Sequence, residues 1–291
     1  MSTVACAALI TGAALLSAPV AIADAHHPDT PAASPAPTPV AATQPSAPTP
    51  SAAQLAEQMQ AAVEASSPGT QVGIDITDTT TGAVLVGLNT GQQFYTASVV
   101  KLLIALDALN TQGWQPDSAT ADEVTQMLSA SDDDIADALW DANGGNDIVT
   151  RMADLIGLPG TQPPSDPTEW GETLTTPADV VTIYHYITTR VPAPSRTLLL
   201  TALNHADRIA ADGTDQFFGI PDALTPDTWA VKQGWMTLDT STTLDTTGLV
   251  GTSAQPDRYA VVILTSQPAD TDWATGGAAL TAALAPVRSI L

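Results

Sequence analysis

The sequence predicts an α/β protein in which one antiparallel sheet is assembled from both ends of the folded chain, with a block of helices inserted between its strands. Two segments with alternating apolar residues lie near the start of the folded region, at 71–79 and 83–90, and three strand-like segments lie near its end. The residues between these two groups follow helical periodicity. Because strands from both ends can pair while the helices between them pack separately, we expect a sheet with an all-helical lobe beside it.

The individual elements follow from their periodicity and from the residues at their ends. A helix over 51–66 precedes the two alternating segments, which Thr81-Gly82 joins as a hairpin. A strongly apolar helix follows over about 98–110. Further helices are expected at about 121–130, 132–142, 146–157, 177–190 and 195–204. The late strands are expected at 228–238, 243–252 and 258–267, and a last helix at 273–287.

The N-terminal part of the chain differs in composition from the rest. Residues 3–23 are uncharged and rich in Ala, Leu, Val and Ile, and the small-x-small pattern Ala23-Asp24-Ala25 is typical of a signal peptidase site. Residues 1–25 are therefore predicted to be an export signal, with an uncleaved membrane anchor or a lipid on Cys6 as alternatives. Residues 26–50 contain eight prolines among Ala, Ser and Thr, which predicts an extended linker. The folded domain is expected to cover residues 51–291.

The composition excludes several classes of function. The chain carries 31 acidic and 8 basic residues, for a net charge of −23, so nucleic acid and anionic membrane surfaces would repel it. Its single cysteine lies in the predicted signal, and none of its four histidines pairs with another at the spacing of helical metal ligands. We therefore expect no metal site and no cysteine nucleophile. We also expect a monomer.

Only two lysines occur in the chain, Lys101 and Lys232, so any chemistry that needs an amine must use one of them. Ser98 precedes Lys101 by three residues at the start of the apolar helix, which places both side chains on one face within hydrogen-bonding reach. A buried lysine near a helix N-terminus has a lowered pKa and can act as the base for a serine nucleophile. The alternative is a serine that only begins the helix and a lysine whose ammonium reaches the surface.

Two further motifs follow along the chain. Ser131 with Asp132 and Asp133 precedes a helix, a pattern that is typical of ordinary N-capping or, if it lies near the lysines, of a serine that carries a proton. Lys232 lies in a predicted strand, and Gly234, two residues later, would let a ligand approach the strand backbone closely. Each of these motifs, like the Ser98–Lys101 pair, is weak evidence alone. The order in which they occur together along the chain favours a catalytic site.

The chain resembles the penicillin-recognising serine enzymes, which comprise the class A β-lactamases and the penicillin-binding DD-peptidases, in the ordered motifs Ser98-x-x-Lys101, Ser131-Asp132-Asp133 and Lys232-Gln233-Gly234. The resemblance covers most of residues 51–291. It implies the β-lactamase-like (DD-peptidase) α/β fold, with a five-stranded antiparallel sheet flanked by helices and an all-helical lobe. It also implies serine hydrolase chemistry, without a cofactor, on β-lactams or on D-Ala-D-Ala-type amides of the cell wall.

The resemblance assigns roles to individual residues. It implies that Ser98 is acylated, that Lys101 and Ser131 move protons, and that Lys232 holds the substrate carboxylate. Trp235 follows the glycine of the last motif, and its N–H would form the oxyanion hole together with the N–H of Ser98.

Three positions depart from the family pattern. Asp133 stands where the family has Asn, and Gln233 stands where it has Ser or Thr; together with Gly234 and Trp235 they are predicted to bind the substrate. A carboxylate cannot donate to a substrate amide, and it raises the pKa of a neighbouring lysine. Glu169 is the candidate for the glutamate that activates the deacylating water, against the alternative of a surface glutamate, and no Asn follows it four residues later.

The leading hypothesis is an exported serine hydrolase, extracellular, periplasmic or associated with the cell wall, that forms an acyl-enzyme on a β-lactam or a peptidoglycan peptide. A serine esterase or peptidase for another acyl group is the first alternative, favoured by Gln233 and Asp133. A non-catalytic cell-wall-binding module that keeps the fold is the second, favoured by the missing deacylation pattern and by the linker. Contact with a membrane is expected only through an uncleaved or lipidated N-terminus.

Overall fold

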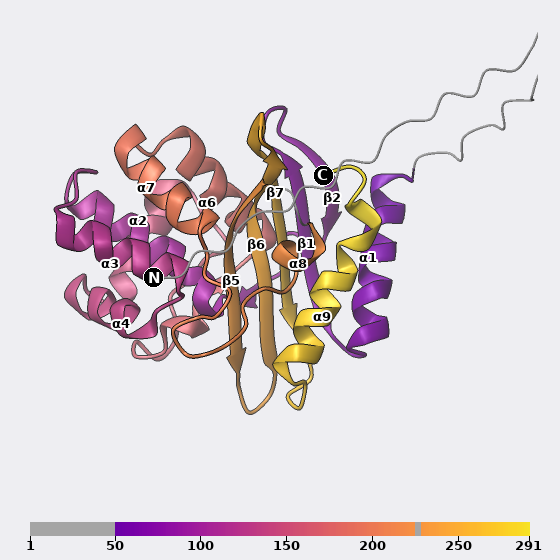
Figure 1. Ribbon diagram of the computed structural model, residues 1–291. Coiled ribbons are helices and arrows are strands. Elements are labelled where there is room, and N and C mark those ends of the chain that lie inside the picture. The colour runs from indigo at the N-terminus through magenta and orange to yellow at the C-terminus, as the bar shows by residue number, and fades with distance from the viewer. Residues whose placement is uncertain (1–49, 225–227) are drawn as a thin grey trace, which may run out of the picture. The chain divides into compact units, whose positions relative to one another are not determined.

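The computed structural model of the chain describes residues 50–224 and 228–291. The predicted export signal, Cys6 and all but the last residue of the predicted linker lie outside the described residues, so the boundaries at residues 25 and 50 stay predictions. Residues Pro48–Leu291 form one unit. Figure 1 shows that its sheet lies between a lobe of helices on one side and a pair of helices, α1 and α9, on the other.

The sheet is antiparallel throughout, with the strand order β2-β1-β7-β6-β5. Its strands are β1 (Gln71–Asp78), β2 (Ala83–Leu88), β5 (Thr228–Thr237), β6 (Thr242–Thr252) and β7 (Gln255–Ser266). Strand β1 pairs with β7, so that Gln71 lies opposite Ser266. This pairing joins the two ends of the folded chain in one sheet, which confirms the predicted architecture.

A second, two-stranded ribbon was not predicted. It consists of β3 (Phe94–Tyr95) and β4 (Leu174–Thr175). Each strand has two residues, too few to show the alternation by which a strand is recognised in a sequence. The ribbon brings the segment before Ser98 next to the segment after Glu169, because Thr96 N donates to Thr173 O over 2.9 Å.

The helices agree with the prediction to within a few residues at their ends. The α-helices are α1 (Ala52–Ser66), α2 (Lys101–Thr111), α3 (Ser118–Ser129), α4 (Asp133–Ala142), α5 (Asn146–Ile156), α6 (Pro177–Thr189), α7 (Ala193–Asn204), α8 (Ile220–Ala223) and α9 (Trp273–Ala283). Three 3-10 turns are η1 (Ala97–Val100), η2 (Trp170–Glu172) and η3 (Ala285–Val287). The short helix α8 was not predicted, and α3 begins earlier than expected because the side chain of Asp117 caps it by accepting from Thr120 N.

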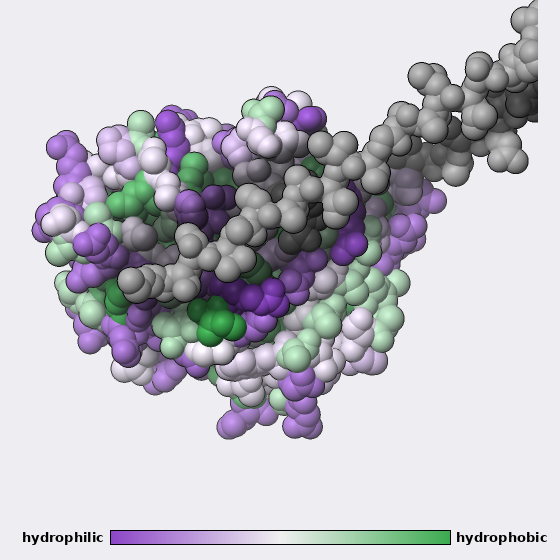
Figure 2. Space-filling view, in the orientation of Figure 1, coloured by the Kyte–Doolittle hydropathy of each residue, from purple (hydrophilic) through white to green (hydrophobic). Residues whose placement is uncertain are grey.

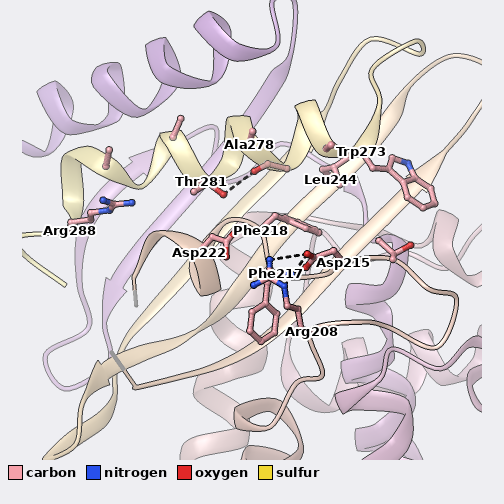
Figure 3. Close-up of a pocket in the computed structure, with 15 residues that line it drawn as sticks. Arg208, Asp215, Phe217, Phe218, Asp222, Leu244, Trp273, Ala278, Thr281 and Arg288 are labelled. Carbon is pink, nitrogen blue, oxygen red and sulfur yellow. Dashed lines mark hydrogen bonds and ion pairs between the residues drawn. The ribbon is translucent and has the colours of Figure 1, made fainter. Parts of the chain in front are cut away.

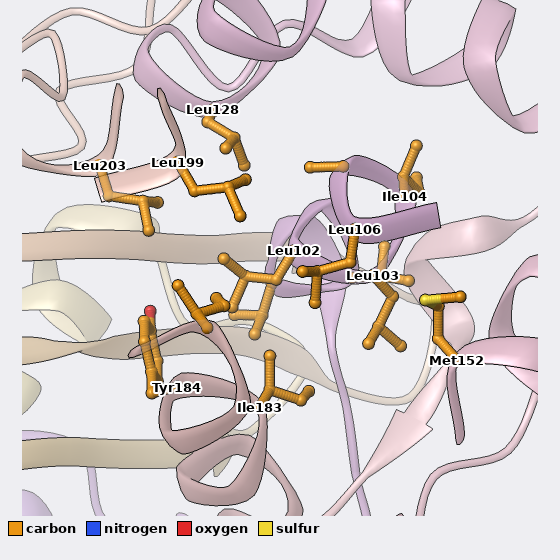
Figure 4. Packing of buried hydrophobic residues seen from close by; sticks show 14 of the residues in the cluster. Leu102, Leu103, Ile104, Leu106, Leu128, Met152, Ile183, Tyr184, Leu199 and Leu203 are labelled. Carbon is orange, nitrogen blue, oxygen red and sulfur yellow. The ribbon is translucent and has the colours of Figure 1, made fainter. Parts of the chain in front are cut away.

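A hydrophobic core lies on each face of the sheet. On one face, α6 and α7 pack against β5, β6 and β7, and α2 contributes to the same core, as Figure 4 shows for Ile183, Leu199 and Leu102. On the other face, α1 and α9 cover side chains such as Ile74 and Ile263. Full burial of one such side chain is worth about 1.5–3 kcal/mol, so these two layers fix the sheet that carries Lys232.

Helix α2 is the centre of the helical lobe. Each residue from Lys101 to Leu109 is buried, which confirms the prediction that this apolar helix is enclosed. Its one acidic residue, Asp107, is also fully buried and accepts two hydrogen bonds from the guanidinium of Arg151 on α5, over 3.0 and 2.9 Å. The paired hydrogen bonds satisfy both carboxylate oxygens and tie α2 to α5.

The surface of the described part is mainly polar. Figure 2 shows hydrophilic residues over much of one face, with hydrophobic residues in separate small patches. The exposed large hydrophobic residues among those described are Val84, Leu155, Ile209 and Trp273. Within residues 50–224 and 228–291, the chain forms no helix with the length and the apolar character needed to cross a membrane.

Candidate active site

Ser98 and Lys101 meet at the junction of η1 and α2. The ammonium Nζ of Lys101 lies 2.7 Å from Ser98 Oγ. The side chain of Lys101 is 0% exposed, so the alternative in which the lysine reaches the surface is wrong. Ala97, just before the serine, has a φ of 41°, a region that non-glycine residues adopt at an energetic cost. The surrounding packing therefore holds the backbone at Ser98 in a strained conformation.

Ser131 lies between the two lysines. Its Oγ accepts a hydrogen bond from Lys232 Nζ over 2.8 Å, and its backbone carbonyl accepts one from Lys101 Nζ over 3.2 Å. Its φ of 53° is again a strained value. N-capping was the alternative role for the Ser131 motif. Asp132, not Ser131, has that role, because Asp132 Oδ1 accepts a hydrogen bond from Ile135 N at the start of α4.

Lys232 reaches the site from β5, an edge strand of the sheet. Besides Ser131, its Nζ donates to the carbonyl of Gln233 over 3.0 Å. Gly234 was predicted to let a ligand approach the strand, and the structure shows a further reason for a glycine at this position. A Cβ atom on Gly234 would lie 2.7 Å from the carbonyl oxygen of Thr96, so the glycine lets β5 pack directly against the turn that carries Ser98.

Asp133 adds a charge that the family pattern lacks. Its Oδ1 lies 2.5 Å from Lys101 Nζ, and its side chain is 57% exposed. Burial lowers the pKa of Lys101, and the carboxylate of Asp133 opposes that shift in part. The pKa of Lys232 falls well below its usual value, first because of burial and then because of the charge of Lys101. Both lysines are therefore easier to deprotonate than free lysine.

A cleft of about 330 Å³ opens beside Ser98. Trp170 and Trp235 line it. The Trp170 ring centroid lies 4.4 Å from Lys101 Nζ, and its Nε1 donates to Asp137 Oδ1 over 2.7 Å. The indole ring thus covers the buried ammonium by a cation–π contact.

Two predicted site residues do not join the central cluster. Gln233 is buried with its amide turned away from the cleft: its Nε2 donates to Phe218 O over 2.6 Å, and its Oε1 accepts from Thr246 Oγ1 over 2.9 Å. Because both ends of this amide are engaged within the protein, it does not replace the missing hydroxyl. Glu169 lines the cleft but is exposed, in a segment that precedes η2.

Two acidic residues at the site were missed. Asp137 lines the cleft one helical turn after Asp133 on α4, and this i, i+4 spacing could have identified it. Asp212 accepts a hydrogen bond from Trp235 Nε1 over 2.9 Å, and its charge raises the pKa of both lysines. Asp212 is followed by Gly213, and this pair predicts only a turn in a loop, so nothing in the sequence identifies Asp212 as a site residue.

A larger cavity, of about 590 Å³, lies between α9 and the segment 208–222. Figure 3 shows Phe218, Thr281 and Arg288 around it, and none of the predicted site residues is in its lining. Nowhere in the described ranges do three or more His, Cys, Asp or Glu side chains gather in a way that could hold a metal ion.

Comparison with known proteins agrees with this architecture. A model of the β-lactamase enzyme family matches residues 54–113. A β-lactamase from Chitinophaga pinensis superposes with a TM-score of 0.66 at 16% identity, over 81% of this chain and 98% of that one. A variant of PBP-A, solved as its acyl-enzyme with penicillin G, has a TM-score of 0.65 at 20% identity, over 84% and 98%. LppW of Mycobacterium tuberculosis, described provisionally as a lipoprotein, is 36% identical over 234 residues, which are 77% of this chain and 72% of LppW.

The fold is that of the β-lactamases and penicillin-binding proteins, as the sequence predicts. Because the chain is at most 20% identical to the two solved structures named above, their similarity shows the fold alone. The chain belongs to the same family as LppW, which it matches over most of its length. The match of residues 54–113 and the shared fold support a divergent member of the serine β-lactamase and penicillin-binding family.

Proposed function

We propose that this protein is an exported active-site-serine hydrolase in which Ser98 forms an acyl-enzyme. The observation that carries the proposal is the distance of 2.7 Å between Ser98 Oγ and the Nζ of a fully buried lysine, Lys101. A serine becomes nucleophilic when a base within hydrogen-bonding distance accepts its proton. Family membership and the fold support a hydrolase of this kind.

In the proposed reaction, Ser98 Oγ attacks the carbonyl carbon of the substrate while its proton passes to the neutral form of Lys101. The tetrahedral oxyanion is held by the N–H groups of Ser98 and Trp235, which both line the cleft. Ser131 donates a proton to the leaving group, and the proton that Lys101 took from Ser98 returns to Ser131 through Lys232, whose Nζ lies 2.8 Å from Ser131 Oγ. Water then cleaves the acyl–serine ester and restores the serine hydroxyl.

The substrate depends on what the cleft offers to a carboxylate. A β-lactam or a D-Ala-D-Ala-type peptide is the first candidate, because PBP-A, which shares the fold, was solved as an acyl-enzyme with penicillin G. The engaged amide of Gln233 favours a serine esterase or peptidase for another acyl group instead, since it removes a contact to the substrate carboxylate. Glu169 is proposed as the residue that activates the deacylating water from its place in the cleft lining.

A non-catalytic cell-wall-binding module is the second candidate function. The observation that favours it is the contact between Asp133 and Lys101, because a carboxylate at 2.5 Å stabilises the protonated lysine, which is not a base. Retained peptidoglycan binding in a Ser98→Ala, Lys101→Ala double mutant, together with no hydrolysis by the wild type, would support the module. Measurable turnover by the wild type would exclude it.

An envelope location is part of the proposal. The relative LppW is described provisionally as a lipoprotein, which supports export of this chain and attachment or release at the cell envelope. The predicted boundaries 1–25, 26–50 and 51–291 for signal, linker and hydrolase domain are kept as proposals.

Intact-protein mass spectrometry tests the proposal directly. The protein is incubated in parallel with penicillin G and with an uncharged alkyl fluorophosphonate, and Ser98→Ala is the control. We expect a fluorophosphonate adduct that is lost in Ser98→Ala. An adduct with penicillin as well would support the β-lactam version, and labelling by the fluorophosphonate alone would support another acyl substrate. Labelling by neither reagent would refute the nucleophile.

A further inference from the structure

The cleft beside Ser98 carries negative charge on its walls. Asp133, Asp137 and Glu169 are among the side chains that line it, and the described lining includes no basic residue. Asp133 is more than half exposed although it contacts Lys101, and Asp137 and Glu169 are exposed. A carboxylate on an incoming molecule would therefore meet three like charges before it met any cation.

Lys101 offsets one of these charges, that of Asp133, from below the cleft surface, whereas Asp137 and Glu169 form no ion pair among the described residues. Lys101 and Lys232 are 0% and 1% exposed, and neither is part of the cleft lining. The Nζ of Lys232 already donates to Ser131 Oγ and to Gln233 O. Two of the three N–H groups of this ammonium are therefore engaged within the protein, and Gln233, whose amide donates to Phe218 O, offers an incoming carboxylate no hydroxyl.

Aromatic rings complete the surface. Trp170 and Trp235 line the same cleft as the three carboxylates. Indole rings placed beside carboxylates form a surface that attracts ammonium groups, because the ring face and the carboxylate both carry negative potential. Neither group attracts an anion.

We propose that this cleft selects acyl substrates that carry a positive charge and rejects those that carry a carboxylate near the reacting carbonyl. The inference rests on the proposed function, since it takes Ser98 as the nucleophile, and of the substrates named there it favours another acyl group over β-lactams and D-Ala-D-Ala-type peptides, which carry such a carboxylate. It assigns to Asp133, Asp137 and Glu169 the recognition of an ammonium group on the substrate, in place of the carboxylate anchor that the family pattern implies for Lys232.

The test uses three alkyl fluorophosphonates of equal chain length that end in a trimethylammonium, a tert-butyl or a carboxylate group. Reaction forms a bond between Ser98 Oγ and phosphorus and releases fluoride, while the serine proton passes to Lys101. The second-order rate of labelling is followed by intact-protein mass spectrometry. We expect the trimethylammonium probe to react about tenfold faster than the uncharged isostere, and the carboxylate probe slower than both.

Salt and two variants identify the cause of the preference. Raising the ionic strength from about 0.1 M to about 1 M shortens the Debye length from about 10 Å to about 3 Å, so the preference should shrink. The double variant Asp137→Asn, Glu169→Gln should lower the ratio of cationic to anionic rates several-fold. Glu57→Gln removes one carboxylate from α1, on the opposite side of the sheet, and should leave that ratio unchanged.

The outcomes separate this inference from the proposed function. If all three probes label Ser98 at similar rates, or if the carboxylate probe is the fastest, the charge selection is refuted while the nucleophile stands. A preference that neither salt nor the double variant reduces would also overturn the assignment to these carboxylates. If no probe labels Ser98, the proposed function fails, and the inference fails with it.

Discussion

Asp133 is the residue whose replacement tests the electrostatics of the site most sharply. Asp133→Asn restores the amide that the family pattern has at this position and removes one negative charge beside Lys101. The protonated form of Lys101 loses its closest anion, so the neutral form becomes more populated at a given pH. A neutral Lys101 is the base that the proposed reaction requires.

The distance between the two groups sets the size of the effect. Lys101 Nζ and Asp133 Oδ1 are 2.5 Å apart, and the Asp133 side chain is 57% exposed. Because solvent reaches this carboxylate, Coulomb's law with the dielectric constant of water is the cautious choice, and it gives about 1.7 kcal/mol for unit charges at that distance. At 1.36 kcal/mol for each factor of ten, labelling of Ser98 should become about tenfold faster at a pH where Lys101 is mostly protonated.

The assay is the rate of Ser98 labelling by the uncharged tert-butyl fluorophosphonate across a range of pH. The rate should rise with pH as Lys101 loses its proton, and the Asp133→Asn profile should lie at lower pH than the wild-type profile. Asp134→Asn is the matched control, because Asp134 is the next residue of α4, is exposed and carries the same charge without contacting Lys101. A profile that stays in place in Asp133→Asn, or that moves equally in Asp134→Asn, would refute this account of the site.

Three other substitutions probe the frame around the site. Gly234→Ala should lower the free energy of unfolding in urea by about 1–3 kcal/mol and slow the labelling of Ser98, because there is no room for its Cβ atom. Gly91→Ala is the control: its Cβ meets no atom within 4 Å, so stability and labelling should both stay unchanged. Arg151→Met should destabilise the fold by about 3 kcal/mol, because it leaves the buried carboxylate of Asp107 unpaired. Adding Asp107→Asn to this variant should recover most of the lost stability, and no recovery would contradict the pairing. Between the lowered pKa of Lys232 and 10.5, the unfolded chain binds a proton that the folded chain has released, so this lysine should make stability rise with pH by at most about 1.36 kcal/mol per unit. The lowered pKa of Lys101 adds a rise of the same sign. Lys232→Met should therefore reduce the slope in urea unfolding between neutral pH and about pH 9 without removing it, and an unchanged slope would show that Lys232 does not cause it.

The sequence predicted the sheet and the central helix because their signals are periodic and long. The apolar helix that begins after Ser98 has no polar face, and burial on all sides is the only packing that suits it. The strands β5, β6 and β7 span ten to twelve residues each, so their type is clear from composition alone. The order of the three motifs along the chain then determined which residues were expected to meet.

The orientation of single side chains could not be predicted in the same way. Gln233 alternates with Lys232 along β5, and its amide is directed to Phe218 and Thr246, which are distant in the sequence. Asp212 reaches Trp235 from a loop, and a loop conformation depends on tertiary contacts rather than on local pattern. Such contacts are set by the completed fold, and a single sequence carries no periodic signal for them.

The contact of Asp133 also makes the two lysines of the site unequal. Asp133 lies 2.5 Å from Lys101, while the contacts of Lys232 Nζ are a hydroxyl and a carbonyl, those of Ser131 and Gln233. Burial lowers the pKa of both lysines, and the charge of Lys101 lowers that of Lys232 further, whereas the carboxylate of Asp133 opposes the shift at Lys101. In the proposed reaction Lys101 must be neutral to accept the proton of Ser98, so Asp133 opposes the state in which this serine has its base.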